Sequence, residues 1–193
     1  MQNPYSIYSD EELMAFLARG EVKAFDELYG RYAQRLTLYF TRMLGYNKVN
    51  AEDALHDLFL KLVQSPERFD SSRSFKTWIY SAAFNQCKNY YRHREVVKRS
   101  EDVLGHALEG IREPELGKWL LEIDAQRFRT VLMDVLDSLS PEKKEAFVLR
   151  FQEDKKIAEI ARIQNCPEGS VKSRLHYTLR ILEEKLIDYH PHL

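Results

Sequence analysis

Apolar residues along this chain recur every three or four positions, which is the spacing of one face of an α-helix. Between residues 50 and 64, for example, apolar pairs stand four positions apart, at 54/55, 58/59 and 62/63. No convincing run alternates apolar and polar residues in the manner of a β-strand. The sequence therefore predicts an all-α protein. The expected helices cover residues 9–20, 23–44, 50–64, 74–94, 127–139, 140–151, 156–163 and 168–187.

Charge is unevenly distributed along the chain. From residue 68 to 99, eight Lys and Arg stand against two acids, whereas from 101 to 126 seven acids stand against two bases. Residues that break helices punctuate the acidic stretch: Gly105, Gly110, Pro114 and Gly117. Such a composition is typical of a linker.

This pattern predicts two small helical domains. We expect an N-terminal domain at 1–95, a flexible acidic linker at 96–126 and a C-terminal domain at 127–193. One short helix is expected inside the linker, around Trp119. A length of 193 residues suits either one domain or two small ones.

Composition excludes several classes of protein. The net charge is −1, so any surface for nucleic acid must come from local segregation of charge. The two cysteines, Cys87 and Cys166, form neither a disulfide framework nor a Cys-x-x-Cys site, which favours a reducing, cytoplasmic setting. The first residues lack the pattern of a signal peptide, and no apolar run is long enough to span a membrane. We therefore expect no membrane insertion.

The C-terminal pair of short helices predicts a helix-turn-helix. Apolar residues mark the inner side of both helices, and Asn165-Cys-Pro forms the turn between them. The second helix would leave one side free for a DNA major groove. That side carries Ser170, Lys172, Ser173, Arg174 and Tyr177. Lys and Arg suit guanine edges and phosphates, and Ser suits phosphates. A helical hairpin with a solvated charged face is the alternative.

The helix expected at 74–94 carries aromatic and basic residues on the side opposite Phe75 and Ile79. These residues are Thr77, Tyr80, Phe84, Lys88, Tyr91 and Arg92. Aromatic rings stack on unpaired bases and cations hold phosphates, so this face suits single-stranded nucleic acid. The alternative is that the aromatic side chains, Trp78 among them, pack in the core of a small bundle.

The helix expected at 50–64 has an acidic polar side with Asp53, His56 and Asp57. This side is either a partner-binding face or a solvated one. A metal-dependent enzyme using these three residues is a further alternative.

Common nucleotide-binding and hydrolase motifs are absent from the sequence, so we expect no enzyme activity, no cofactor, no metal site and no small-molecule substrate.

Taken together, these segments resemble the bacterial sigma factors of the extracytoplasmic-function (ECF) class. The resemblance covers roughly residues 9–95 and 127–187, and its blocks occur in the family's order. They include Ala51-Glu-Asp-Ala-Leu-His-Asp-Leu-Phe, Ser74-Phe-Lys-Thr-Trp-Ile-Tyr-Ser-Ala-Ala-Phe-Asn, Leu136-Asp-Ser-Leu-Ser-Pro-Glu and Cys166-Pro-Glu-Gly-Ser-Val-Lys-Ser-Arg-Leu. The resemblance implies that core RNA polymerase and promoter DNA are partners, and it suggests an anti-sigma factor.

The resemblance also implies roles for individual residues. Asp53, His56, Asp57 and Phe59 correspond to the segment that docks on the clamp coiled coil of the polymerase. Residues that read or open the minus-ten promoter element are Phe69, Trp78, Tyr80, Asn85, Lys88 and Arg92. Residues that read the minus-35 element are Ser170, Lys172, Ser173, Arg174 and Tyr177.

The sequence departs from the family pattern in two places. Asn165 replaces a common glycine in the turn, which asparagine tolerates because it accepts positive φ. His176 to Leu179 stand where relatives often have more arginine.

Two rival interpretations remain besides the enzyme. One is an ordinary helix-turn-helix regulator that acts without polymerase, and the other is a degenerate relative that serves only as a bound adaptor.

Overall fold

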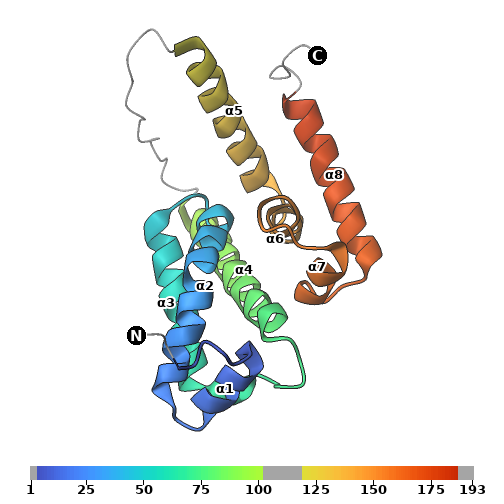
Figure 1. Ribbon diagram of the computed structural model, residues 1–193. Coiled ribbons are helices and arrows are strands. Elements are labelled where there is room, and N and C mark those ends of the chain that lie inside the picture. Colours follow the sequence, from blue (N-terminus) through green and yellow to red (C-terminus); the bar gives the residue numbers. More distant parts are fainter. Residues whose placement is uncertain (1–3, 102–118, 187–193) are drawn as a thin grey trace.

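The computed structural model describes residues 4–101 and 119–186, and every regular element in these two ranges is helical (Figure 1). The N-terminal half contains α1 (Asp10–Ala18), α2 (Val22–Met43), α3 (Lys48–Gln64), the 3₁₀ turn η1 (Pro66–Arg68) and α4 (Phe75–Glu101). The C-terminal half contains α5 (Trp119–Ser138), α6 (Pro141–Phe147), the π-helical turn η2 (Val148–Gln152), α7 (Ile157–Ile163) and α8 (Glu168–Leu186). The expected all-α fold is confirmed.

The N-terminal bundle is organised around α2. Its buried side chains recur at helical spacing and pack against α1, α3 and α4. They are Ala24, Leu28, Tyr32, Leu36, Tyr39, Phe40 and Met43. At the start of α1, the Ser9 side chain accepts from the backbone N–H of Glu12 while the Glu12 side chain accepts from the Ser9 N–H. This capping box explains why the chain becomes helical at Asp10.

Two helices extend into the segment expected to be a linker. Helix α4 continues to Glu101 instead of ending near 94, and α5 begins at Trp119 instead of near 127. Between residues 75 and 101 the sequence has no Gly or Pro, so nothing in it stops the helix. The change in charge therefore did not mark the helix ends. The remainder of the expected linker, 102–118, lies outside the described residues.

The C-terminal half places the long helices α5 and α8 against each other, with α6 and α7 at one end of the pair (Figure 1). Val135 and Leu136 of α5 pack with Phe147 and Leu182 in a small core of their own. The rest of this half joins the N-terminal core. Ala146, Val148 and Leu149 belong to the same hydrophobic cluster as the buried residues of α2 and α4. The two halves are thus closed on one another.

The described residues contain neither a membrane-spanning helix nor a cluster of metal ligands. No helix in the two described ranges is both long and apolar enough to cross a membrane. Within the same ranges, no three His, Cys, Asp or Glu side chains gather in a way that could hold a metal ion.

Candidate nucleic-acid interface

The helices α7 and α8 form the expected helix-turn-helix. The buried side chains of Ile160, Val171 and Leu175 hold the two helices together. In the turn, Asn165 has φ of 48°, a conformation that asparagine tolerates, and the Cys166 N–H donates to the carbonyl of Ala161 at 3.0 Å. The turn lets α8 start at Glu168 with one side held on α7 and the other side open.

The open side of α8 carries the residues predicted to read the minus-35 element. Lys172, Ser173 and Tyr177 are exposed, whereas Ser170 and Arg174 are half-buried. The Lys143 ammonium of α6 lies 5.9 Å from the centre of the Tyr177 ring. The structure therefore places these predicted residues on one helix, with three of them available to a ligand.

Gln164 is a residue that the sequence analysis missed. Its side-chain oxygen accepts a hydrogen bond from Arg174 Nη1, and its amide nitrogen donates to Glu145 Oε2 at 2.9 Å. Arg174 Nη1 also lies 3.2 Å from Cys166 Sγ. Both contacts use Nη1. Within the described ranges no hydrogen bond of the other guanidinium nitrogens of Arg174 is found, so these nitrogens can donate to a ligand. Gln164 thus links Arg174 of α8 to Glu145 of α6 and holds Arg174 in place. A lone glutamine in a turn carries no sequence signal for this positioning role.

The loop before α4 builds an aromatic cluster. Phe69 is buried, and its ring lies 5.3 Å from Phe75 and 5.6 Å from Trp78, both in edge-to-face contacts. Asp70 stiffens the loop by accepting hydrogen bonds from the hydroxyl and the N–H of Ser72, and these bonds lower the pKa of Asp70. In this closed arrangement the Phe69 ring is therefore packed against Phe75 and Trp78 and is not exposed to solvent.

Trp78 and Asn85 line a common cleft of about 500 Å³. From the C-terminal half, Arg162 and Asn165 line the same cleft. Asn85 is exposed and Trp78 is half-buried. Two of the residues predicted to read the minus-ten element thus lie beside the turn of the helix-turn-helix.

The basic and aromatic side of α4 is not the open face that the sequence predicted. Tyr80 is 1% exposed and Phe84 is 3% exposed. The hydroxyl of Tyr80 donates to Glu153 at 3.2 Å, and the Lys155 ammonium lies 4.5 Å from the centre of its ring. The alternative weighed from the sequence, that these aromatics are core, is what the closed structure shows, because the C-terminal half covers this side of α4.

The two basic residues of this face are placed differently. Lys88 is half-buried, with its ammonium 4.8 Å from the centre of the Phe84 ring. Arg92 is exposed. Arg92 is thus available to a ligand in the closed arrangement, whereas Lys88 is partly engaged.

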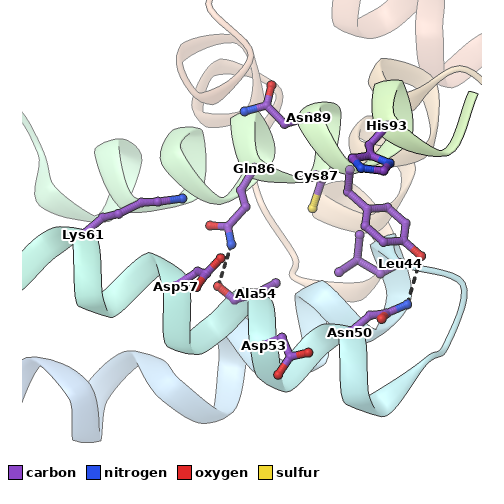
Figure 2. A pocket seen from close by; sticks show the side chains of 11 residues that line it. Leu44, Asn50, Asp53, Ala54, Asp57, Lys61, Gln86, Cys87, Asn89 and His93 are labelled. Atoms are coloured by element: carbon purple, nitrogen blue, oxygen red, sulfur yellow. Dashed lines mark hydrogen bonds between the residues drawn. The ribbon is translucent and has the colours of Figure 1, made fainter. Parts of the chain in front are cut away.

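The acidic face of α3 is open. Asp53, His56 and Asp57 are exposed, and Asp53 and Asp57 line a groove of about 410 Å³ between α3 and α4 (Figure 2). Gln86 of α4 crosses the groove to donate to the Ala54 carbonyl at 2.9 Å. Lys61 and His93 also line it.

Phe59 differs from its three predicted companions. It is 3% exposed and packs edge-on against Phe25, with ring centres 5.8 Å apart. The Tyr29 ring is 4.9 Å away. Phe59 therefore belongs to the core of the α2–α3 pair, and its ring does not lie on the acidic face.

The fold defines the class of the protein: an all-α protein that joins a helix-turn-helix to a second, four-helix unit. Comparison with known proteins names the family. The Sigma-70 region 2 profile matches residues 28–96, and the Sigma-70 region 4 profile matches residues 129–182. The two matches together take in more than half of the chain. The chain belongs to the sigma-70 family, in its ECF class, and is a sigma factor.

Relatives of full length support this assignment. The ECF RNA polymerase sigma-E factor of Haemophilus influenzae is 28% identical over 185 residues, which cover 92% of this chain and 95% of that protein. The RNA polymerase sigma-H factor of Pseudomonas aeruginosa is 27% identical over 92% of this chain and 93% of its own length. The sigma-E factor of Escherichia coli K12 is also 27% identical, over 92% and 94% respectively.

Solved structures share the fold. CnrH, solved in complex with the cytosolic domain of CnrY, aligns with a TM-score of 0.66 at 21% identity over 94% of this chain and 99% of that one. The sigma factor RpoE of Bartonella quintana, solved with the anti-sigma factor NepR, aligns with a TM-score of 0.64 at 21% identity over 86% and 98%.

Proposed function

We propose that this sigma factor binds core RNA polymerase through α3, reads the minus-ten element with the loop and helix at 69–92, and reads the minus-35 element with α8. The observation that carries the proposal is that one chain holds a helix-turn-helix with exposed Lys172, Ser173 and Tyr177 together with a matched region 2 unit. The protein supplies no catalytic group for nucleotide addition, and it works in the cytoplasm with the polymerase.

The exposed carboxylates Asp53 and Asp57 support the polymerase contact. They stand one turn apart on α3 beside a groove that a helical partner can enter. An acidic face attracts a basic partner and orients its approach. His56 extends the same exposed face.

Run-off transcription with purified core polymerase tests the whole proposal. Transcripts that start at defined promoters only when the protein is added support it. Sequence-specific binding to DNA without any effect on polymerase would instead favour an ordinary helix-turn-helix regulator.

An anti-sigma factor is a proposed partner. CnrH and the Bartonella RpoE were both solved in complexes, the latter with an anti-sigma factor, and this chain shares their fold. The test is to add a candidate partner to the run-off reaction. Loss of promoter-directed transcripts that excess sigma factor restores would support the partnership.

A further inference from the structure

The first helix of the protein holds the start of α4, the helix that carries most of the predicted minus-ten residues. The backbone N–H of Phe75, the first residue of α4, donates a 2.8 Å hydrogen bond to Oε1 of Glu11 on α1, 64 positions earlier in the chain. The first N–H groups of a helix have no partner inside that helix. Glu11 therefore satisfies, from another helix, a donor that α4 itself leaves free.

The side chain of Glu11 suits this position chemically. A carboxylate at a helix N-terminus is stabilised by the partial positive charge there, and charge-assisted hydrogen bonds are the stronger ones. The local cap of α4 is longer, since the Ser74 hydroxyl accepts from the N–H of Thr77 at 3.4 Å. The bond to Glu11 is thus the shorter of these two contacts at the beginning of α4.

Helix α1 is itself anchored to the rest of the bundle. Its buried side chains are Leu13, Met14 and Leu17. In its first turn, Asp10 accepts a hydrogen bond from the hydroxyl of Tyr32 on α2 and pairs with Arg31 at 2.8 Å. Glu11 is therefore presented by a helix that is held by the core along one side and by α2 at its first residue.

Phe75 joins this support to the aromatic cluster around Phe69. The Phe75 ring is fully buried and meets the Tyr32 ring edge-on, with ring centres 5.4 Å apart. The same ring also contacts the rings of Phe69 and Trp78. Because packed side chains transmit a displacement to their neighbours, a shift of the Phe75 backbone also moves these rings.

The exposed loop at 70–74, which we call the reading loop, lies between two fixed points. All five of its residues are exposed. Within the loop, the Ser72 hydroxyl and N–H donate to Asp70. Buried Phe69 precedes the loop and buried Phe75 follows it. The hydrogen bond from α4 to α1 thus fixes the second end of the reading loop.

We infer that Glu11 is a positioning residue for minus-ten recognition: by accepting from the N–H of Phe75, it sets the place of the reading loop and of the first turn of α4. The inference rests on the proposed function, in which the loop and helix at 69–92 read this element. Glu11 acts through the backbone of α4 and not by touching DNA. Recognition needs residues held to within about 0.5 Å, so a loosened loop reads the element less selectively.

The test compares the full-length wild type with Glu11→Ala and Glu11→Gln. Alanine removes the acceptor, whereas glutamine keeps an oxygen at the same place and loses only the charge. The matched control is Glu12→Ala. Glu12 is the next acid of α1, but its side chain accepts from Ser9 within the cap of α1. This control weakens α1 and leaves the bond to α4 in place, because Asp10 still anchors the first turn.

Three quantities are measured for each form. They are the hydrogen exchange of the peptide that covers residues 69–80, the affinity for core polymerase, and promoter opening by permanganate reactivity. Opening is measured on a promoter found by the run-off assay and on the same promoter with single substitutions in its minus-ten element.

Glu11→Ala should speed the exchange and leave polymerase affinity unchanged, because the proposed polymerase contact lies on α3. Promoter opening should fall about threefold to tenfold, the range of one hydrogen bond's net contribution. The ratio of opening between the original and the substituted elements should also shrink. Glu11→Gln should recover most of the opening, and Glu12→Ala should open the promoter as the wild type does.

The other outcomes overturn the inference. Glu11→Ala that opens and discriminates promoters like the wild type does so, even if its hydrogen exchange is faster. A defect as large in Glu12→Ala would show that only the stability of α1 matters. No recovery in Glu11→Gln would show that the charge acts and not the hydrogen bond. Equal losses of polymerase affinity and promoter opening in Glu11→Ala would indicate a general structural role.

Failure of the proposed function is recognised from the wild type alone. A wild type that neither binds polymerase nor opens a promoter removes that function and, with it, the inference. Should Glu11→Ala lose its helical circular dichroism, Glu11→Asp replaces it. Aspartate draws the carboxylate back by one methylene group and should show the same defects to a smaller degree.

Discussion

The phenolic hydroxyl of Tyr39 on α2 donates a 2.9 Å hydrogen bond to Oε1 of Glu145 on α6, 106 residues further along the chain. Glu145 has no exposed surface, and this burial raises its pKa from 4.5 to about 8. The neighbours that oppose the rise are Gln164, Tyr39, Lys88 and Arg174. Burial outweighs them, so the closed state holds this carboxyl group in its protonated form at neutral pH.

The first prediction is that the closed state weakens as pH rises from about 5 to 8. The pKa of Glu145 is about 8 when closed and returns toward 4.5 on opening or unfolding. Its stabilising contribution is complete below 4.5 and is lost as pH rises through 8, by at most about 1.4 kcal/mol per pH unit. Urea unfolding or the radius of gyration across this range measures the effect.

Glu145→Gln provides the control for this pH dependence. The amide keeps the shape of the side chain and cannot ionise, so the slope between pH 5 and 7 should be smaller than that of the wild type. The nearby Cys87 thiol stays protonated across that range, because burial raises its pKa. Lys155, whose pKa burial lowers to about 8, adds an opposite slope only above that range. Equal slopes would contradict the assignment to Glu145.

The second prediction concerns the minus-35 element. Lys172→Ala and Arg174→Ala should each weaken its recognition by about 1–3 kcal/mol, the value of a good contact to a base. Footprinting of the polymerase complex on promoter DNA measures this loss. Lys185→Ala, in the last turn of the same helix, removes a similar charge away from the reading face and should leave the footprint unchanged.

The third prediction separates Asn85 from Phe69. Asn85 is exposed, so Asn85→Ala should change the free energy of unfolding by less than about 0.5 kcal/mol while impairing promoter opening. Phe69 is 7% exposed, and Phe69→Ala should destabilise the fold by about 3–5 kcal/mol as well as impairing opening. Thermal unfolding and permanganate reactivity of promoter thymines measure the two effects. Equal loss of promoter opening and polymerase binding in Asn85→Ala would argue for a structural role.

The fourth prediction concerns the acidic face of α3. Asp53→Ala and Asp57→Ala should lower the affinity for core polymerase severalfold and leave stability nearly unchanged, because both side chains are exposed. Glu52→Ala is the control, since Glu52 is an exposed acid of the same helix that pairs with Lys48. A loss of affinity as large in Glu52→Ala would mean that only net charge matters.

Phe59 shows what motif position and helical periodicity can and cannot predict about a side chain. Its position in the family's motif placed it with Asp53 and Asp57, and helical spacing alone also allowed it to be core. The structure has Phe59 packed on Phe25 and Tyr29. Periodicity predicts which side of a helix is apolar. Whether an aromatic ring at the border of that side is buried depends on the packing of the neighbouring helix.

The sequence by itself determined the all-α fold, the helix-turn-helix and a turn residue, Asn165, that tolerates positive φ, because spacing of apolar residues, caps and turn residues act over a few positions of chain. It did not determine the far end of α4 at Glu101 or the start of α5 at Trp119. Tertiary structure alone decided that Tyr80 is buried, that Glu145 meets Tyr39, and that Glu153 joins Arg42 to Tyr80. These contacts link residues between 73 and 111 positions apart. The residues carry no local signal for such contacts, since a buried Glu and an exposed Glu look alike until the packing around them is known.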